Sequence, residues 1–510
     1  MTSGSSSDPI SRSSSRSSSR SSSVTPPVTA SVMHSNSATE LLPALVHQDR
    51  QQAIAYRGGQ AISVAQFLAD AYALAALLPD ARYLLNGCID RYHFVVTMTA
   101  ALLRGQTNVL PHNHVPATLG HVQTQFKGLY CVTDSETLFV DLVRVNYPKQ
   151  MAAPDDHPIP MIAADLAAAC LFTSGSTGDP VAHPRTWGQM VLSARSAVQR
   201  LHKTVSGGYT ILGTVPPQHS YGFESTVHLA LQGGGALVAD RPFFPADIVA
   251  TLAALPRPVA LVTTPVHLRA LLTVAPPAID LILSATAPLP LELAHEVEQR
   301  FGAPVLEIYG STESGQVASR RTTAGELWQA LDGVQMSVVP LEQTHEDPAH
   351  AGSGLAVAQG PFVNGTIVMS DLISMRDAGR FVLHGRIADM VNIAGKRSSL
   401  AFLERQLLSI DGVVDGAFLI NEEASRATAR VIAFVVAPTL SAQAITDALR
   451  ERIETVFLPR PLLLVDGLPR DGNGKLPRQR LEALARSLLR VRAKPANPAK
   501  PANPANPAKS

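Results

Sequence analysis

The sequence TSGSTG, residues 173–178, has the composition of a loop that binds phosphate. Backbone N–H groups left open at glycines, with hydroxyls between them, can surround an anion. An apolar segment that we predict to be a buried strand precedes the loop, and a helical pattern follows it. The continuation Asp179-Pro180 excludes the P-loop motif, which needs a lysine here. The residues alone leave two interpretations open, a phosphate-binding loop and an ordinary surface turn.

A second segment, IYGSTES at residues 308–314, joins a hydroxyl to a carboxylate after an apolar strand. The Thr312 hydroxyl can bond a phosphate oxygen. The Glu313 carboxylate can hold Mg²⁺, which prefers few carboxylates together with phosphate oxygens. The same letters also fit a helix N-terminus, with Ser or Thr as the N-cap and Glu in the first turn. Both interpretations stay open on this motif alone.

Three charged residues further along the chain could complete a nucleotide site. Asp371, which we predict just after a strand, can accept hydrogen bonds from ribose hydroxyls, and Arg386 can pair with ribose or phosphate. The alternative is a surface ion pair beside a β-turn at Gly379. Lys475 lies in the Gly-rich, Pro-bounded segment LPRDGNGKLPRQRL, residues 468–481. A lysine on a mobile loop suits a distant anion, although most lysines are simply solvated.

The elements that must position these residues alternate between strand and helix patterns. Such alternation predicts an α/β fold with parallel sheets and helices on their faces. Ligands in these folds bind at the carboxyl ends of the strands. The expected binding loops therefore follow Phe172, Val215, Ser284 and Tyr309.

The second half of the chain changes character. Short, Gly-punctuated strands from residue 331 to 381 predict an antiparallel β subdomain, and the segment from residue 387 predicts a small α+β domain of ordinary size. We predict four parts of the chain. Residues 1–40 form a disordered Ser/Arg-rich arm and residues 41–387 a large α/β domain. Residues 388–488 form a small mobile α+β domain and residues 489–510 a disordered Pro/Ala/Lys/Asn tail.

Composition restricts the classes of function. The net charge of +1 gives no reason to expect nucleic-acid or membrane-surface binding, and no apolar run is long enough to span a bilayer. Three cysteines in no ligand spacing fit a reducing compartment without disulfides. We therefore expect a cytoplasmic protein with no nucleic-acid or membrane partner. A targeting role for the Ser/Arg arm is disfavoured because it has almost no apolar face.

The four motifs, in this order and with PPQHSYG (216–222) and SATAPLP (284–290) between them, resemble the adenylate-forming superfamily. This superfamily includes acyl- and aryl-CoA synthetases, adenylation domains of peptide synthetases and firefly-type luciferases. The resemblance covers nearly everything outside the two tails. It implies activation of a carboxylic acid with ATP and Mg²⁺ to acyl-AMP and pyrophosphate, followed by transfer to the thiol of coenzyme A or of a carrier-protein phosphopantetheine.

The resemblance also implies roles for individual residues. Lys475 would bridge the substrate carboxylate and the α-phosphate, Thr312 would touch the α-phosphate, and Glu313 would hold Mg²⁺. The β- and γ-phosphates would lie in the loop of Thr173, Ser174, Gly175, Ser176, Thr177 and Gly178. Asp371 and Arg386 would hold the ribose. Tyr309 would stack on the adenine, and Ala287, Glu307 and Ile308 would line the adenine pocket. The acyl group would lie beside His219, Tyr221 and Gly222. The strand around Gly395 would line the pantetheine tunnel after the small domain rotates.

Three positions depart from the family pattern. Val181 and Ala182 stand where Lys-Gly is common, and we hypothesise that Arg185 supplies the missing positive charge as a catalytic residue. Ala388 occupies the hinge position, which is usually acidic or Lys. Asn392 replaces a common lysine and makes the thioester step less certain than adenylation.

The leading hypothesis is an acid–thiol ligase for an aryl acid, such as a hydroxybenzoate-like one, or a fatty acid. Amino-acid activation is disfavoured because Glu224 is the only acid near HSYGFE, where that branch places an aspartate. A degenerate member that binds nucleotide or acyl ligand without turnover is the alternative, motivated by the changed Pro180-Val181 segment and Ala388. A third hypothesis, an RNA-associated protein, depends on the Ser/Arg arm alone.

Overall fold

The structure is a computed structural model, and it describes residues 40–136, 141–149, 153–173, 180–202, 208–340, 353–387, 390–393, 396–421, 430–471 and 474–493. Several sequence predictions lie outside these residues. They are the arm up to residue 39, the loop from Ser174 to Asp179, Ala388, Gly395 and the tail from residue 494. No helix among the described residues is both long enough and apolar enough to cross a bilayer.

A first sheet forms from the N-terminal third of the chain. In the described residues it has six strands in the order β10-β9-β5-β4-β6-β7. Neighbours are parallel except β9 and β10, which are antiparallel. The strands are β4 (Tyr83–Asn86), β5 (Thr107–Leu110), β6 (Tyr130–Thr133), β7 (Arg144–Asn146), β9 (Ala167–Thr173) and β10 (Val181–Thr186).

A second, larger sheet has the order β18-β19-β20-β21-β17-β16-β15-β14-β13-β11-β12-β2-β3 within the described part of the chain. It is parallel from β15 to β2 and antiparallel from β15 to β18, as predicted for residues 331–381. Its strands are β2 (Ala53–Arg57), β3 (Gln60–Ser63), β11 (Thr210–Gly213), β12 (Ala236–Val238), β13 (Val259–Thr263), β14 (Leu281–Ser284), β15 (Val305–Ser311), β16 (Gly315–Arg321), β17 (Leu327–Ala330), β18 (Gln335–Pro340), β19 (Ser353–Gln359), β20 (Ile367–Asp377) and β21 (Arg380–Arg386). A short antiparallel pair, β1 (Leu41–Pro43) and β8 (Met161–Ala163), stands apart from it.

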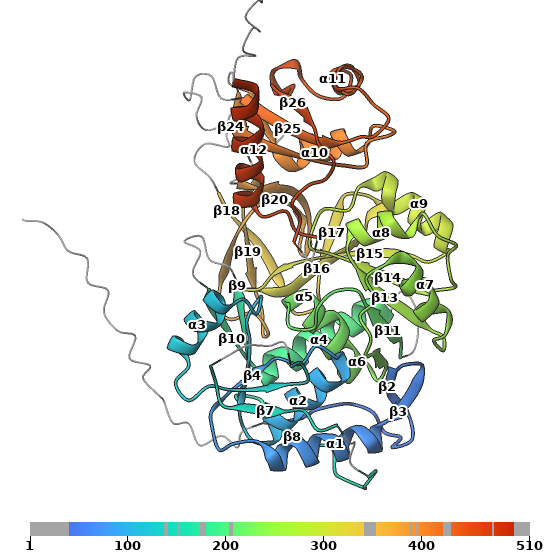
Figure 1. The fold of residues 1–510 in the computed structure, drawn as a ribbon, viewed down its shortest axis with the longest axis vertical. Coiled ribbons are helices and arrows are strands. Elements are labelled where there is room, and N and C mark those ends of the chain that lie inside the picture. The colour runs from blue at the N-terminus through green and yellow to red at the C-terminus, as the bar shows by residue number, and fades with distance from the viewer. Residues whose placement is uncertain are drawn as a thin grey trace, which may run out of the picture. The chain divides into compact units, whose positions relative to one another are not determined.

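Helices cover both sheets and have recognisable termini. Ser63 caps the first of them by accepting from Gln66 N, and Asp90 caps the second by accepting from Tyr92 N and His93 N. In Figure 1, α7, α8 and α9 lie along β13 and β14, and their apolar residues share one core with those strands. The helices are α1 (Val64–Leu77), α2 (Arg91–Leu103), α3 (Pro116–Gln125), α4 (Trp187–His202), α5 (Ser220–Gly222), the π-helix η1 (Phe223–His228), α6 (Leu229–Gly233), α7 (Pro245–Ala253), α8 (Pro265–Leu271), α9 (Leu291–Phe301) and the 3₁₀ turn η2 (Thr322–Ala324).

The C-terminal part has cores of its own, whose described residues all lie between 391 and 489. Its last helix runs to Ala493, past residue 489, where we predicted the tail to begin. The elements are β22 (Met390–Ile393), β23 (Lys396–Ser399), α10 (Leu400–Leu408), β24 (Asp415–Asn421), β25 (Arg430–Val436), α11 (Ala442–Arg450), the 3₁₀ turn η6 (Thr455–Phe457), β26 (Leu462–Leu464) and α12 (Arg478–Ala493). The predicted α/β class, with an antiparallel subdomain and an α+β segment after it, is confirmed.

Candidate active site

The TSGSTG loop joins two antiparallel strands. β9 ends at Thr173 and β10 begins at Val181, and these two residues are paired in register. The helix that we predicted after the loop is present as α4, which begins at Trp187, but the strand β10 that precedes it was not predicted. The Thr173 hydroxyl is hydrogen bonded to His183 Nε2 at 3.0 Å across the ladder. The strands that flank the loop are thus paired antiparallel, with a hydroxyl and an imidazole hydrogen bonded near their ends.

Thr312 and Glu313 lie in a tight turn between β15 and β16. Gly310 lies so close to Gly315 that a Cβ on Gly310 would meet the Gly315 carbonyl oxygen at 2.1 Å. The side chains of Ser311 and Ser314 add hydrogen bonds across the turn. The helix N-terminus that we kept as an alternative is excluded by this geometry. The Glu313 carboxylate is 41% exposed and lies 3.8 Å from His183 Nε2.

Arg185, to which we assigned the missing positive charge, is buried and has hydrogen-bond partners in the Thr312–Glu313 turn. It is 6% exposed, and its Nη2 donates to the carbonyl oxygens of Thr312 and Glu313 at 2.9 Å each. Its Nη1 donates to Phe362 O at 3.4 Å. Burial lowers the pKa of the guanidinium, and the negative charges of Glu224 and Glu313 oppose this effect. Arg185 therefore holds the backbone of the Thr312–Glu313 turn, and its role as a charge that binds phosphate stays a prediction.

Asp371 and Arg386 face each other on neighbouring strands. They are register partners in β20 and β21, with Arg386 Nε 3.7 Å from Asp371 Oδ1. We had predicted Asp371 just after a strand, but it lies within β20. The Arg386 side chain is 65% exposed and the Asp371 side chain 15% exposed. Tyr309 lies beside them: burial and the Asp371 carboxylate, to which its hydroxyl is hydrogen bonded, raise the pKa of Tyr309.

The residues predicted around adenine differ in what their side chains contact. Tyr309 is 7% exposed and packs against Trp328 and Phe381, with ring centroids 5.6 and 5.8 Å away. The Glu307 carboxylate accepts from Leu289 N at 2.9 Å and from Arg320 Nε at 2.8 Å. The side chain of Glu307 therefore holds the loop of Ala287 to β15, while Ala287 and Ile308 are only partly buried.

Lys475 is presented by a loop that its own backbone stabilises. Lys475 N donates to Asp471 Oδ1 at 2.9 Å, and Asp471 N donates to Lys475 O at 2.7 Å. Arg470 donates to Gly474 O and, through two nitrogens, to Asp415. A Cβ on Gly474 would lie 3.4 Å from Thr264 Oγ1, so the loop contacts the end of β13.

The Lys475 ammonium is desolvated although the residue as a whole is exposed. Desolvation lowers the pKa of Lys475, and so does the positive charge of Arg386. The negative charges of Asp471 and Glu313 act in the opposite direction and raise it. Burial and the positive charge of Lys475 together lower the pKa of His219 to about 3, and burial is the larger cause. A cation from the last motif is therefore in electrostatic contact with residues of three earlier motifs.

The HSYG segment is held against the end of β13. The Tyr221 hydroxyl donates to Thr263 O at 3.2 Å. A Cβ on Gly222 would meet Pro216 O at 2.0 Å, so only glycine fits there. His219 and Tyr221 are partly buried, and His219 is neutral at pH 7 because of its low pKa.

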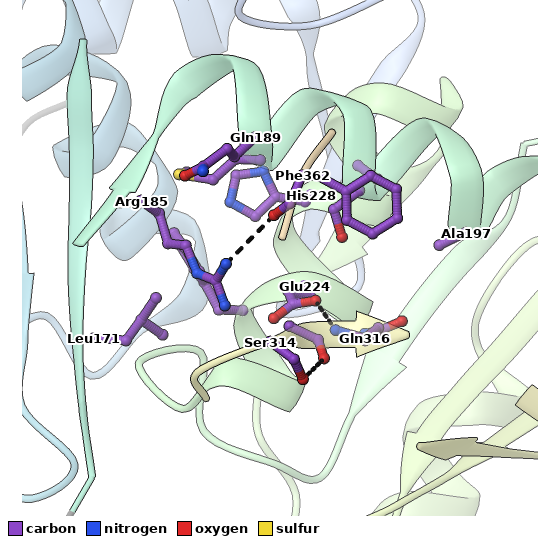
Figure 2. A pocket seen from close by; sticks show the side chains of 14 residues that line it. Leu171, Arg185, Gln189, Ala197, Glu224, His228, Ser314, Gln316 and Phe362 are labelled. Carbon is purple, nitrogen blue, oxygen red and sulfur yellow. Dashed lines mark hydrogen bonds between the residues drawn. The ribbon is translucent and has the colours of Figure 1, made fainter. Parts of the chain in front are cut away.

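A pocket that the sequence did not reveal lies behind the Thr312–Glu313 turn. The space between its walls is about 460 Å³, a figure that includes open solvent. Figure 2 shows its polar side chains, among them Arg185, Glu224 and His228. A second pocket of about 300 Å³ shares Ala197, Glu224 and Gln316 with it and adds Ile308 and Ser225.

Together these elements form a charged centre beside a mostly apolar pocket. Residues of three different motifs, among them Glu313, Arg386 and His219, interact electrostatically with Lys475. Cations and one exposed carboxylate at the same place can neutralise two anions that must approach each other. The structure describes Thr173 alone of the six TSGSTG residues, and it describes Asn392 as part of β22.

Comparisons with known proteins support one family. The family model for "AMP-binding enzyme" matches residues 132–361. A 2-succinylbenzoate–CoA ligase from Bacillus velezensis is 25% identical over 358 residues, 66% of this chain and 73% of the relative. A p-hydroxybenzoic acid–AMP ligase from Mycobacterium tuberculosis is 27% identical over 431 residues, 78% of this chain and 59% of the relative.

Solved structures agree in fold. An o-succinylbenzoate coenzyme A synthetase from Bacillus subtilis, in complex with ATP and magnesium ion, aligns with a TM-score of 0.70 at 22% identity, covering 85% of this chain and 97% of that one. Residues 132–361 thus match the AMP-binding enzyme family, and the relatives support an AMP-forming synthetase of the acyl- and aryl-CoA type.

Proposed function

We propose that the protein activates a small carboxylic acid with ATP to the acyl-AMP, releases pyrophosphate, and passes the acyl group to the thiol of coenzyme A or of a carrier-protein phosphopantetheine. The observation that carries this proposal is that the loop of Lys475 contacts Thr264 at the end of β13, where the charges of Glu313 and Arg386 shift the pKa of Lys475. These residues come from motifs far apart in the sequence. A binding protein without turnover would not need a desolvated lysine beside an exposed carboxylate.

The chain's own residues divide the work of adenylation. Lys475 would pair with the substrate carboxylate and the α-phosphate, both anionic, and so lower the cost of bringing them together. Thr312 would bond the α-phosphate, and Asp371 with Arg386 would hold the ribose. Arg185 acts as a positioning residue, because its two bonds to the carbonyls of Thr312 and Glu313 fix the turn.

Magnesium fits the residues at this turn. Mg²⁺ is usually held by one or two carboxylates together with phosphate oxygens and waters. The Glu313 carboxylate is partly exposed at the centre, and the described residues contain no cluster of three or more His, Cys, Asp or Glu that would form a complete protein cage. We assign Glu313 as the protein ligand; bound Mg²⁺ would neutralise phosphate charge.

The substrate class follows from the pocket walls. The pocket is mostly apolar, and Met190, Phe223 and Phe362 contribute to its lining. Apolar walls suit an aryl acid, and the names of the relatives, a 2-succinylbenzoate–CoA ligase and a p-hydroxybenzoic acid–AMP ligase, support the aryl class. A fatty acid is the alternative substrate. After adenylation, we propose that the small domain rotates and presents the segment around Gly395 to the thiol.

The test is pyrophosphate release by the full-length protein with ATP, Mg²⁺ and a panel of aryl and fatty acids. Release that depends on the acid supports the proposal, and its absence with every acid would contradict it. Coenzyme A and a phosphopantetheinylated carrier protein are then compared as acceptors of the acyl group. Thioester formation with only one of them assigns the acceptor.

A further inference from the structure

One wall of the pocket behind the Thr312–Glu313 turn carries a buried polar side chain that has no hydrogen-bond partner. His228, the last residue of η1, lines it and is 1% exposed. Neither ring nitrogen has a hydrogen-bond partner in the structure. The ring packs perpendicular to Phe223 at a centroid distance of 4.4 Å. A buried imidazole without partners is unfavourable, so a partner from a ligand would stabilise it.

The imidazole can offer one donor and one acceptor. Burial lowers the pKa of His228 to about 3, and the ring is therefore neutral at physiological pH. A neutral imidazole carries a proton on one nitrogen and a lone pair on the other. The group that matches this pair best is one that also donates and accepts, such as a hydroxyl.

Glu224 supplies a second acceptor on the pocket wall. Its Oε1 accepts from Ser220 Oγ at 2.7 Å, and its Oε2 accepts from Gln316 N at 2.9 Å. A carboxylate has about four lone-pair sites. Capacity therefore remains on Glu224 after these bonds and a further one from Ser193. Arg185 on the same wall gives the pocket a positive charge as well.

We propose that this pocket receives the far end of the acid substrate and selects acids that carry a neutral hydroxyl there, with His228 and Glu224 as specificity-determining residues. This inference rests on the proposed function. The pocket is in the right place, because Ser314 and Gly315 line it directly after Glu313. The helical segment that follows His219 and Tyr221 supplies another wall.

Other end groups fit less well. A wholly apolar end leaves both nitrogens of His228 unpaired. The charges of Glu224 and Arg185 already face each other on this wall, so a carboxylate or an ammonium group would be buried there without a counter-charge of its own. A hydroxyl avoids both penalties. A site built to hydrogen bond a substrate hydroxyl discriminates strongly against the analogue that lacks it, because its own polar groups stay unpaired.

The experiment compares kcat/KM for acid-dependent pyrophosphate release between hydroxylated acids and their deoxy partners. The probes are 2-, 3- and 4-hydroxybenzoate against benzoate, and 4-hydroxycinnamate against cinnamate. We expect at least one hydroxylated acid to be preferred about tenfold or more, the effect of leaving one buried polar group unpaired. In His228→Leu the preference should fall to below about threefold, and His228→Gln, which keeps a donor and an acceptor, should restore part of it.

His47→Leu is the matched control. His47 is also a buried histidine, 2% exposed, but it bonds Gly235 O and does not line the pocket. Its substitution should leave the preference unchanged. Equal rates for both members of every pair in the wild type, or an undiminished preference in His228→Leu, would overturn the inference while the proposed function stands. The wild-type ratios decide the matter if His228→Leu does not fold. Absence of pyrophosphate release with every acid would instead be a failure of the proposed function.

Discussion

Replacement of Arg185 by leucine separates a positioning role from direct phosphate binding. The substitution removes three hydrogen bonds, to the carbonyl oxygens of Thr312, Glu313 and Phe362. Each buried carbonyl left without a donor costs about 1–3 kcal/mol. The two bonds at 2.9 Å are the strong ones, so we expect a loss of about 2–5 kcal/mol in the free energy of unfolding. Glu224 would lose a nearby positive charge at the same time.

The kinetic consequence differs between the two roles. If Arg185 positions the turn, Arg185→Leu lowers kcat for acid-dependent pyrophosphate release with little change in the KM for ATP. If it binds phosphate directly, the KM for ATP rises instead. Stability is followed by urea unfolding and activity by pyrophosphate release at saturating acid. The control is Arg321→Leu, which breaks an exposed ion pair with Glu298 and should cost less than about 1 kcal/mol. A variant as stable as the wild type, with a raised KM for ATP, would refute the positioning role.

Three further predictions concern packing, nucleotide binding and pH. Gly222→Ala should destabilise the fold by about 2 kcal/mol or more, because the added Cβ would meet Pro216 O at 2.0 Å. Gly120→Ala is the control and should be tolerated, because a Cβ at Gly120 has nothing within 4 Å. Thermal melting of both variants tests this prediction. Asp371→Ala should raise the KM for ATP about tenfold while the KM for the acid stays within about twofold, since it removes a charged acceptor for ribose hydroxyls; an unchanged KM for ATP would exclude that role. Because the folded pKa of His228 is about 3 and the unfolded pKa about 6.5, its contribution to stability is present above pH 6.5 and is lost as the pH falls toward 3. Urea unfolding from pH 7 to 4 should show a smaller loss in His228→Leu than in the wild type, by about 1.4 kcal/mol per pH unit below 6.5, and parallel curves would contradict this.

The alternation of elements was predictable because its signals are local. Apolar strand segments and amphipathic helices repeat along residues 167–311, and the structure has strands and helices at these places. β10 was missed because it is short and contains Pro184. An edge strand tolerates a proline, and β10 is at the edge of its sheet. Asp371 was placed after a strand because the length of β20 depends on its pairing with β19 and β21, which the sequence does not show.

The pocket was beyond a sequence argument for a different reason. Phe223 and His228 are five residues apart, and in an α-helix they would point in different directions. The π-helical turn of η1 brings their rings to 4.4 Å. The contacts of Arg185 with the carbonyl oxygens of Thr312 and Glu313 likewise join segments more than one hundred residues apart. Signals of this kind exist only after the chain has folded.

The measurement that tests the central claim most directly is acyl-AMP formation by wild type and Lys475→Ala under identical conditions. The account predicts that the wild type forms acyl-AMP and pyrophosphate in equal amounts. Lys475→Ala should be slower by about a hundredfold or more, the usual cost of removing one group that stabilises developing charge, while it melts at the same temperature. Lys475→Ala that forms acyl-AMP at the wild-type rate would contradict the account, because no other residue is assigned to neutralise both anions.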